Sequence, residues 1–170
     1  MTPRRDEPVH ISIRDATVEE RHQLSPLVEL DDLQWATPPA PNQTHNWKQP
    51  TLIVAATRRE VCGVALATPS LWFEHRLNDP WWSLDAVVVA PTWQNHGLGA
   101  SLVAGIVHRA RTASVSCLYG LCAPKLADWY RQLGFDVSAP SEQLDTGLDV
   151  NYQRLLLTTE NECWISRSFS

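Results

Sequence analysis

The chain has 170 residues, of which 19 are acidic and 14 are basic, so its formal net charge is −5. This length suits one domain with a real core, and the negative charge disfavours an extended nucleic-acid-binding surface. No apolar run reaches the roughly 18 residues that cross a membrane, and none follows the basic residues near the N-terminus. We therefore expect a single cytoplasmic domain over residues 1–170 that has no membrane as partner and for which a nucleic-acid partner is disfavoured.

The cysteines and histidines do not have the spacing of metal ligands. The chain contains four cysteines and six histidines, with no C-x-x-C pair and no closely spaced histidine pair, so no metal site is expected. Cys117 and Cys122 lie in or beside an apolar run. This position favours buried thiols over reactive ones.

The N-terminal segment predicts a strand followed by a helix. Ile11 and Ile13 alternate with polar neighbours over residues 10–17, which is typical of a short strand. Thr17 is placed to cap the following helix, and Glu20 completes a capping box three residues later.

Two further strands are predicted after a proline-rich loop. Residues 36–50 are rich in proline and are expected to form an irregular loop, which at this length is often functional. Residues 51–57 and 61–70 read as strands, and residues 58–60 as the hairpin turn between them.

The middle of the chain predicts a loop, a strand and a long helix. Residues 74–82 are expected to form a loop that includes Trp81 and Trp82, and the strand at 83–90 follows it. Apolar residues then recur at helical spacing up to about Arg111. They are Leu98, Leu102, Val103, Ile106, Val107 and Ala110.

The C-terminal part predicts strand, helix and strand again. Residues 115–123 read as a buried strand and 152–158 as a late strand. Between them a short helix is predicted, because Pro124 suits its first turn and Gly134 its end. The order of elements indicates an α/β or α+β domain with a mixed sheet.

Gly97 and Gly99 stand at the beginning of the long helix, where unpaired N–H groups and the helix dipole can bind an anion. A P-loop is excluded because Ala100 and Ser101 follow instead of lysine and Ser or Thr. A dinucleotide-binding turn is excluded because Leu102 replaces its third glycine. On these residues alone, phosphate binding and a simple tight turn both remain open.

Three motifs in order resolve this choice. They are V-A-P at 89–91, Q-N-H-G-L-G at 94–99 and the A-D-W-Y-R-Q-L-G-F segment at 127–135. Together they resemble the GNAT superfamily of N-acetyltransferases, in which Q/R-x-x-G-x-G/A is the acyl-CoA pyrophosphate loop. The segments at 10–17, 61–68 and 152–157 look like the first, third and last strands of that family, so the resemblance covers nearly the whole chain.

The resemblance implies an α/β (α+β) GNAT fold with acetyl-CoA as co-substrate and no metal. The implied sheet is mixed, mainly antiparallel, of six to seven strands, splayed between strands 4 and 5, and flanked by about four helices. Val87 and Val89 are then expected to hold the pantetheine through their backbone. The residues expected around the pyrophosphate are Gln94, Asn95, His96, Gly97, Leu98, Gly99 and Ala100.

The same resemblance implies catalytic residues. Tyr130 matches the family's tyrosine, which protonates the departing thiolate, although a tyrosine here could also only pack the helix. Family members often use a glutamate near the start of the fourth strand as base, and Asp85 lies nearby. Side chains alternate between the two faces of a strand, and Asp85, Val87 and Val89 are two residues apart. All three are therefore expected on the same face. Among apolar neighbours Asp85 could accept a proton, pair with an arginine or bind the acceptor's ammonium.

The acceptor is expected to be a primary amine of a small molecule, acetylated by direct transfer in a ternary complex. Trp81, Trp82 and Glu74 are the candidate acceptor-binding residues, because aromatic and acidic groups attract a cationic amine with an apolar portion. Acetylation of a protein or of aminoacyl-tRNA is the first alternative, and a non-catalytic acyl-CoA-binding module is the second. Whether the chain forms a homodimer is left open.

Overall fold

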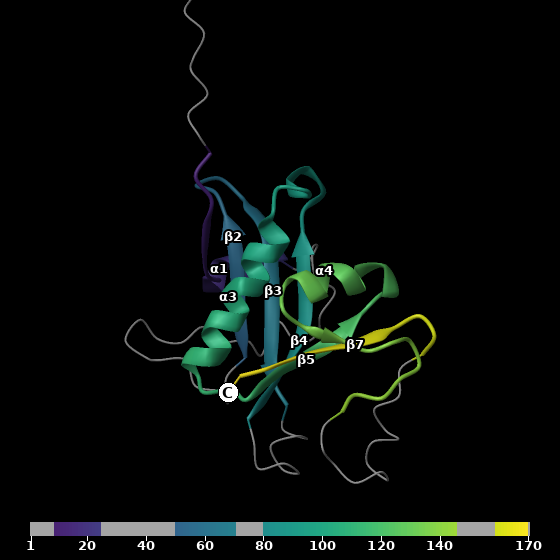
Figure 1. The fold of residues 1–170 in the computed structure, drawn as a ribbon. Helices are drawn as coiled ribbons and strands as arrows, with labels where there is room; N and C mark the ends of the chain where they lie inside the picture. The colour runs from purple at the N-terminus through teal and green to yellow at the C-terminus, as the bar shows by residue number, and fades with distance from the viewer. Residues whose placement is uncertain (1–8, 25–49, 71–79, 146–158, 170) are drawn as a thin grey trace, which may run out of the picture.

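The fold is built on one mixed sheet. The computed structural model describes residues 9–24, 50–70, 80–145 and 159–169. Within these residues, seven strands are hydrogen-bonded in the order β1-β2-β3-β4-β5-β7-β6. Figure 1 labels five of them, β2, β3, β4, β5 and β7. Among the described strands, only β4 and β5 run parallel, and every other neighbouring pair is antiparallel. The mixed, mainly antiparallel sheet predicted from the sequence is thus confirmed. Its strands are β1 (Ser12–Asp15), β2 (Thr51–Ala56), β3 (Val61–Pro69), β4 (Trp81–Val89), β5 (Cys117–Cys122), β6 (Asp136–Val137) and β7 (Cys163–Ser168).

The described part of the chain has one long helix, α3, and two short ones. They are α1 (Val18–Leu24), α3 (Leu98–Thr112) and α4 (Ala127–Gln132), with single 3₁₀ turns at Pro91–Trp93 and Pro124–Leu126. Within the described ranges, no helix is both long enough and apolar enough to span a bilayer.

The predicted capping box begins α1. The Glu20 backbone N–H donates to Thr17 Oγ1 at 3.2 Å, and the Thr17 N–H donates to Glu20 Oε2 at 2.8 Å. Arg14 on β1 also binds the Glu20 carboxylate, at 2.6 Å. This ion pair and the cap hydrogen bonds hold the pKa of Glu20 below its ordinary value, with the Arg14 bond as the largest cause. Through Glu20, the capping box and the Arg14 ion pair connect the start of α1 to β1.

The long helix packs on the sheet through the face that its periodicity predicted. Its buried residues are Leu98, Leu102, Val103, Ile106, Val107 and Ala110. They share one core with Ile53 of β2, Ala65 of β3 and Leu118 of β5. Tyr130 of α4 belongs to the same core, so α3 and α4 cover the same sheet face, as Figure 1 shows. We call this the α3 face.

The opposite face carries separate apolar clusters. Leu24 of α1 packs there with Val54 and Leu66, and Trp81 packs with Cys117 and Leu144. The two cysteines predicted to be buried, Cys117 and Cys122, are buried free thiols. The sheet therefore has apolar contacts on both faces.

The predicted loop before the fourth strand is wrong at its end. Trp81 and Trp82 are the first residues of β4, which was expected to begin at Ser83. Trp82 is fully buried on the α3 face, whereas Trp81 packs on the other face. Bulky aromatic side chains suit a strand that is covered on both faces, and this favours strand over loop here.

The last part of the sheet was not predicted. The strand expected at 152–158 and the loop expected at 36–50 lie outside the described residues. Within the described residues, β7 at Cys163–Ser168 lies between β5 and β6, and the sequence patterns did not predict it. The helix expected at 124–135 is a 3₁₀ turn followed by α4, and Gly134 follows it with φ of +82°.

Candidate active site

The sheet opens between β4 and β5. The two strands pair only from Trp81 with Cys117 to Leu84 with Gly120. At the last pair they come very close, since a Cβ atom on Gly120 would lie 2.8 Å from the Leu84 carbonyl oxygen. β4 continues to Val89 against β3, but no described strand pairs with it on the β5 side. The predicted splay between the fourth and fifth strands is therefore present.

A β-bulge turns Asp85 away from the valines. Leu66 of β3 pairs with Ala86 and Ala67 pairs with Leu84, so Asp85 is an extra residue in β4. Beyond the bulge, the alternation of side chains between the two sheet faces is shifted by one residue. Leu84, Val87 and Val89 consequently share the α3 face, as their core contacts show.

The prediction that Asp85 shares the face of Val87 and Val89 is wrong, because period-two parity holds only in an unbroken ladder. Thr68 of β3 donates its hydroxyl hydrogen to Asp85 Oδ2 at 2.6 Å, and the aspartate is exposed. Val64 and Leu66, which share the parity of Thr68, lie on the face opposite α3. Asp85 therefore lies on that face and has a polar neighbour, in contrast to the apolar surroundings predicted.

The loop after β4 is held by side-chain hydrogen bonds. Gln94 Nε2 donates to the Val89 carbonyl oxygen at 3.1 Å, and His96 Nδ1 lies 2.7 Å from the Gln94 carbonyl oxygen. Trp93 Nε1 donates to Glu60 Oε1 at 3.1 Å, which connects the loop to the β2–β3 turn. The predicted loop residues thus form an exposed, locally braced turn.

The loop leads into α3 with free backbone donors. Gly97 has φ of +78°, a left-handed conformation that glycine adopts at little cost, and Asn95 also has a positive φ of 63°. The Ser101 N–H donates to the Gly97 carbonyl oxygen at 3.1 Å, and no side chain caps the helix start. N–H groups before Ser101 have no partner within the helix, as expected at an anion-binding helix start.

Gly99 lies against an aromatic side chain that the sequence reasoning did not single out. A Cβ atom at Gly99 would lie 3.3 Å from Cζ2 of Trp129 and 3.9 Å from Cγ2 of Val89. Trp129 thus connects α4 to the start of α3 beside the end of β4. The signal in the sequence was its position directly before Tyr130.

Tyr130 is held between aromatic rings. Its ring lies edge-on to Trp129, with centroids 4.7 Å apart, and to Phe135, at 5.5 Å. Only 6% of the residue is exposed. Burial raises the pKa of Tyr130 to about 12, and Cys122 of β5 adds a smaller contribution. The phenol therefore keeps its proton throughout the neutral range.

Tyrosinate absorbance tests this environment. The chain has three tyrosines, and the difference between wild type and Tyr130→Phe isolates one of them. We expect that residue to ionise near pH 12 instead of about 10. Because the folded pKa is raised, Tyr130's contribution to stability is constant below about pH 10 and falls as the pH rises toward 12. Ionisation of Tyr130 near pH 10, about the ordinary value for tyrosine, would contradict its burial.

The structure describes two of the three predicted acceptor-binding residues, Trp81 and Trp82. Trp82 has no exposed surface, so a ligand cannot reach it in this conformation. Glu74 lies outside the described residues. Trp81 adjoins Tyr119 with ring centroids 5.8 Å apart, and Tyr119 adjoins Trp164 at 6.2 Å. An aromatic row of these three side chains thus crosses β4, β5 and β7 on the face opposite α3.

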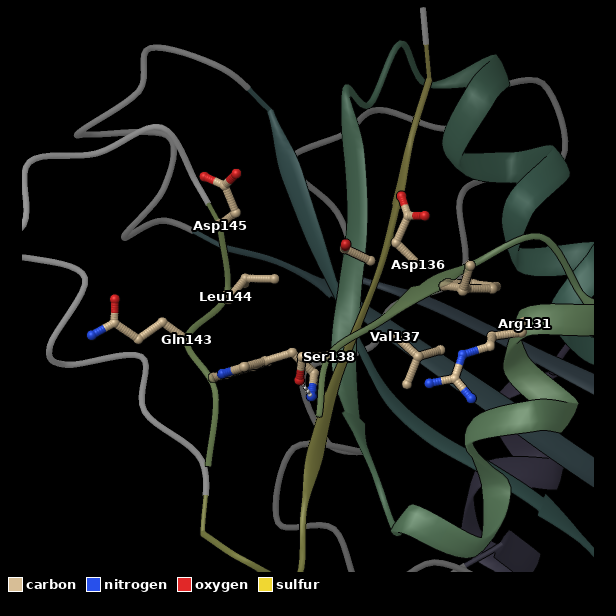
Figure 2. A pocket seen from close by; sticks show the side chains of 10 residues that line it. Arg131, Asp136, Val137, Ser138, Gln143, Leu144 and Asp145 are labelled. Carbon is tan, nitrogen blue, oxygen red and sulfur yellow. Dashed lines mark hydrogen bonds between the residues drawn. The ribbon is translucent and has the colours of Figure 1, made fainter. Parts of the chain in front are cut away.

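A pocket of about 370 Å³ lies elsewhere, at the β6–β7 edge. Figure 2 shows Arg131 of α4 on one side of it and Gln143, Leu144 and Asp145 on the other. None of the loop residues 94–99 lines it. We place the candidate site at the splay instead, because the backbone donors, Tyr130 and Asp85 adjoin that opening.

A match to a known family agrees with this fold. Residues 15–135 match the acetyltransferase (GNAT) family, which is most of the chain. The chain therefore belongs to the GNAT acetyltransferase family, as its motifs predicted.

Solved structures share the fold at low sequence identity. A GNAT family acetyltransferase from Elizabethkingia anophelis with acetyl-CoA bound is 16% identical, with 94% of this chain and 98% of that chain covered and a TM-score of 0.58. The ribosomal-protein-S18-alanine N-acetyltransferase from Escherichia coli is 15% identical, with 95% of each chain covered and a TM-score of 0.60. N-acetylglutamate synthase from Neisseria gonorrhoeae, complexed with coenzyme A and N-acetyl-glutamate, is 18% identical with a TM-score of 0.59. The match covers 96% of this chain but only 36% of that one.

Proposed function

We propose that the protein transfers the acetyl group of acetyl-CoA to a primary amine of a small molecule, in a ternary complex. The observation that carries this proposal is the opening between β4 and β5. Asp85 is the first β4 residue beyond the last pair, on one face of the sheet. Tyr130 lies on the other face, beside Cys122 at the end of β5. A thioester in the opening would have a carboxylate on one side and a phenol on the other.

The cofactor would run from the helix start into the opening. Backbone N–H groups at 95–100 would bind the pyrophosphate, with Gln94 and His96 bracing the loop. The backbone of Val87 and Val89 would hold the pantetheine, because β4 has no described neighbour there on the β5 side. Coenzyme A in two of the related structures supports acetyl-CoA as the co-substrate.

The chemistry needs one proton removed and one supplied. The amine nitrogen attacks the thioester carbonyl carbon, the carbon–sulfur bond breaks, and the sulfur leaves as a thiolate. Asp85, directly or through water, takes the proton that the amine loses. Tyr130 donates toward the sulfur, and its raised pKa keeps that donor protonated. Backbone N–H groups near Val89 stabilise the oxyanion.

The side chains opposite α3 support the proposed acceptor class. Asp85 offers a negative charge to an ammonium, and the aromatic row of Trp81, Tyr119 and Trp164 offers an apolar wall nearby. The net charge of −5 suits a cationic small molecule better than tRNA. These features favour a small amine with an apolar portion over a protein or aminoacyl-tRNA.

Thiol release from acetyl-CoA tests the proposal. Wild-type protein is assayed with benzylamine, phenethylamine and tyramine, and in parallel with a short peptide that has a free α-amine. We expect release that depends on the aromatic amines. Release with the peptide alone would support a protein acceptor, and acetyl-CoA binding with no release in any arm would support a non-catalytic module. Both results contradict the proposal.

A further inference from the structure

A row of polar side chains crosses the sheet face opposite α3. Thr68 of β3 pairs with Ser83 of β4, Ser83 pairs with Tyr119 of β5, and Tyr119 pairs with Ser166 of β7. Direct cross-strand partners lie on the same face. We call these four residues the polar row.

The surroundings of the polar row make it unusual. On the same face, apolar Leu66 precedes Thr68 on β3 and apolar Trp81 precedes Ser83 on β4. All four members of the row are half-buried. Hydroxyl groups cost free energy at half-buried positions unless they form hydrogen bonds, and Tyr119 forms such bonds with Ser70 and Ser83.

Hydrogen bonds fix two members of the row. Tyr119 donates its hydroxyl hydrogen to Ser70 Oγ at 2.9 Å, and Thr68 donates to Asp85 Oδ2 at 2.6 Å. The second bond is short, as expected for a hydroxyl on a carboxylate. It reaches from β3 to the bulged residue, so it holds an exposed carboxylate in one orientation at the mouth of the opening.

We propose that Thr68 is the positioning residue that orients the Asp85 carboxylate toward the acceptor's ammonium. This inference rests on the proposed function and adds a residue to it. The bulge places Asp85 on the acceptor side, and the Thr68 hydroxyl restricts the rotation of its side chain. In this role Thr68 acts through Asp85 and needs no contact with the acceptor or the cofactor.

Thr68→Val tests the inference, because valine keeps the shape and removes the hydroxyl. With phenethylamine as acceptor, we expect kcat/KM for the amine to fall about tenfold, the scale of a lost hydrogen bond to a charged group. The KM for acetyl-CoA should stay unchanged. Thr68→Ser should keep kcat/KM for the amine at the wild-type value, since serine retains the hydroxyl donor. Thr112→Val is the matched control, because its hydroxyl bonds only the turn before it at the far end of α3.

A double-mutant cycle separates positioning from general damage. In an Asp85→Asn background, Thr68→Val should cause no further loss, because the carboxylate that it orients is gone. Thr68→Ala is used in the same cycle if the valine variant does not fold. Phenethylamine binding to the CoA complex, followed by tryptophan fluorescence, provides a readout without turnover.

Wild-type kinetics in Thr68→Val, an equal loss in the Asp85→Asn background, or the same loss in Thr68→Ser would each overturn the role of Thr68 and leave the proposed function standing. Failure of the wild-type protein to bind or acetylate phenethylamine contradicts the small-amine function itself, and the inference falls with it.

Discussion

Tyr130→Phe is expected to lower kcat by about 10²- to 10⁴-fold, the usual contribution of a positioned general acid. The phenol is buried and its pKa is raised to about 12, so it keeps the proton that we propose it donates to the departing sulfur. Phenylalanine keeps the edge-on contacts with Trp129 and Phe135, at 4.7 and 5.5 Å, and should preserve the packing. Steady-state kinetics at saturating acetyl-CoA measure the effect.

The control for Tyr130 is cofactor affinity. Because the proposed role of the hydroxyl concerns the leaving group and not binding, the acetyl-CoA dissociation constant should change less than twofold, or about 0.4 kcal/mol. Unfolding followed in parallel should show a stable variant. A kcat equal to that of wild type would remove Tyr130 from the chemistry and leave it a packing role only.

Gly99→Val is expected to raise the acetyl-CoA dissociation constant at least tenfold, or about 1.4 kcal/mol. A Cβ atom there would lie 3.3 Å from the Trp129 indole, so the indole or the start of α3 must move. Either movement disturbs the N–H groups that we assign to the pyrophosphate. Isothermal calorimetry on a folded variant measures the change.

Gly97 offers a matched comparison for the same loop. No atom lies within 4 Å of a Cβ atom placed at Gly97, so only its φ of +78° opposes a side chain. Asparagine tolerates this conformation better than valine does. Gly97→Asn should therefore bind acetyl-CoA more tightly than Gly97→Val. Unchanged affinity in Gly99→Val would show that the pyrophosphate lies elsewhere.

Local patterns in the sequence predicted much of the fold. The capping box of Thr17 and Glu20, the buried face of α3 and the glycine turn before it depend on residues within a few positions of one another. Such signals are contained in a short stretch, because helix periodicity and backbone conformation are set locally. The splay followed from the family resemblance.

The errors come from non-local structure. The face predicted for Asp85 is wrong because the bulge arises from the pairing of β4 with β3. No residue of β4 by itself indicates that bulge. Trp82 looked like a loop residue beside a proline, but the core beneath α3 encloses it. Thr68 was not considered, because its relation to Asp85 exists only once two strands lie side by side. Register between strands is therefore what single-sequence reasoning lacked.

We infer that acetyl-CoA binds at the beginning of α3 and enters the opening between β4 and β5. Titration of acetyl-CoA into ¹⁵N-labelled protein, followed by amide chemical shifts, tests this binding site. We expect the largest shifts at residues 94–100 and along β4 from Val87 to Val89, with little change around the β6–β7 pocket. Shifts confined to that pocket, at residues such as Ser138 and Gln143, or the absence of any shift, would contradict it.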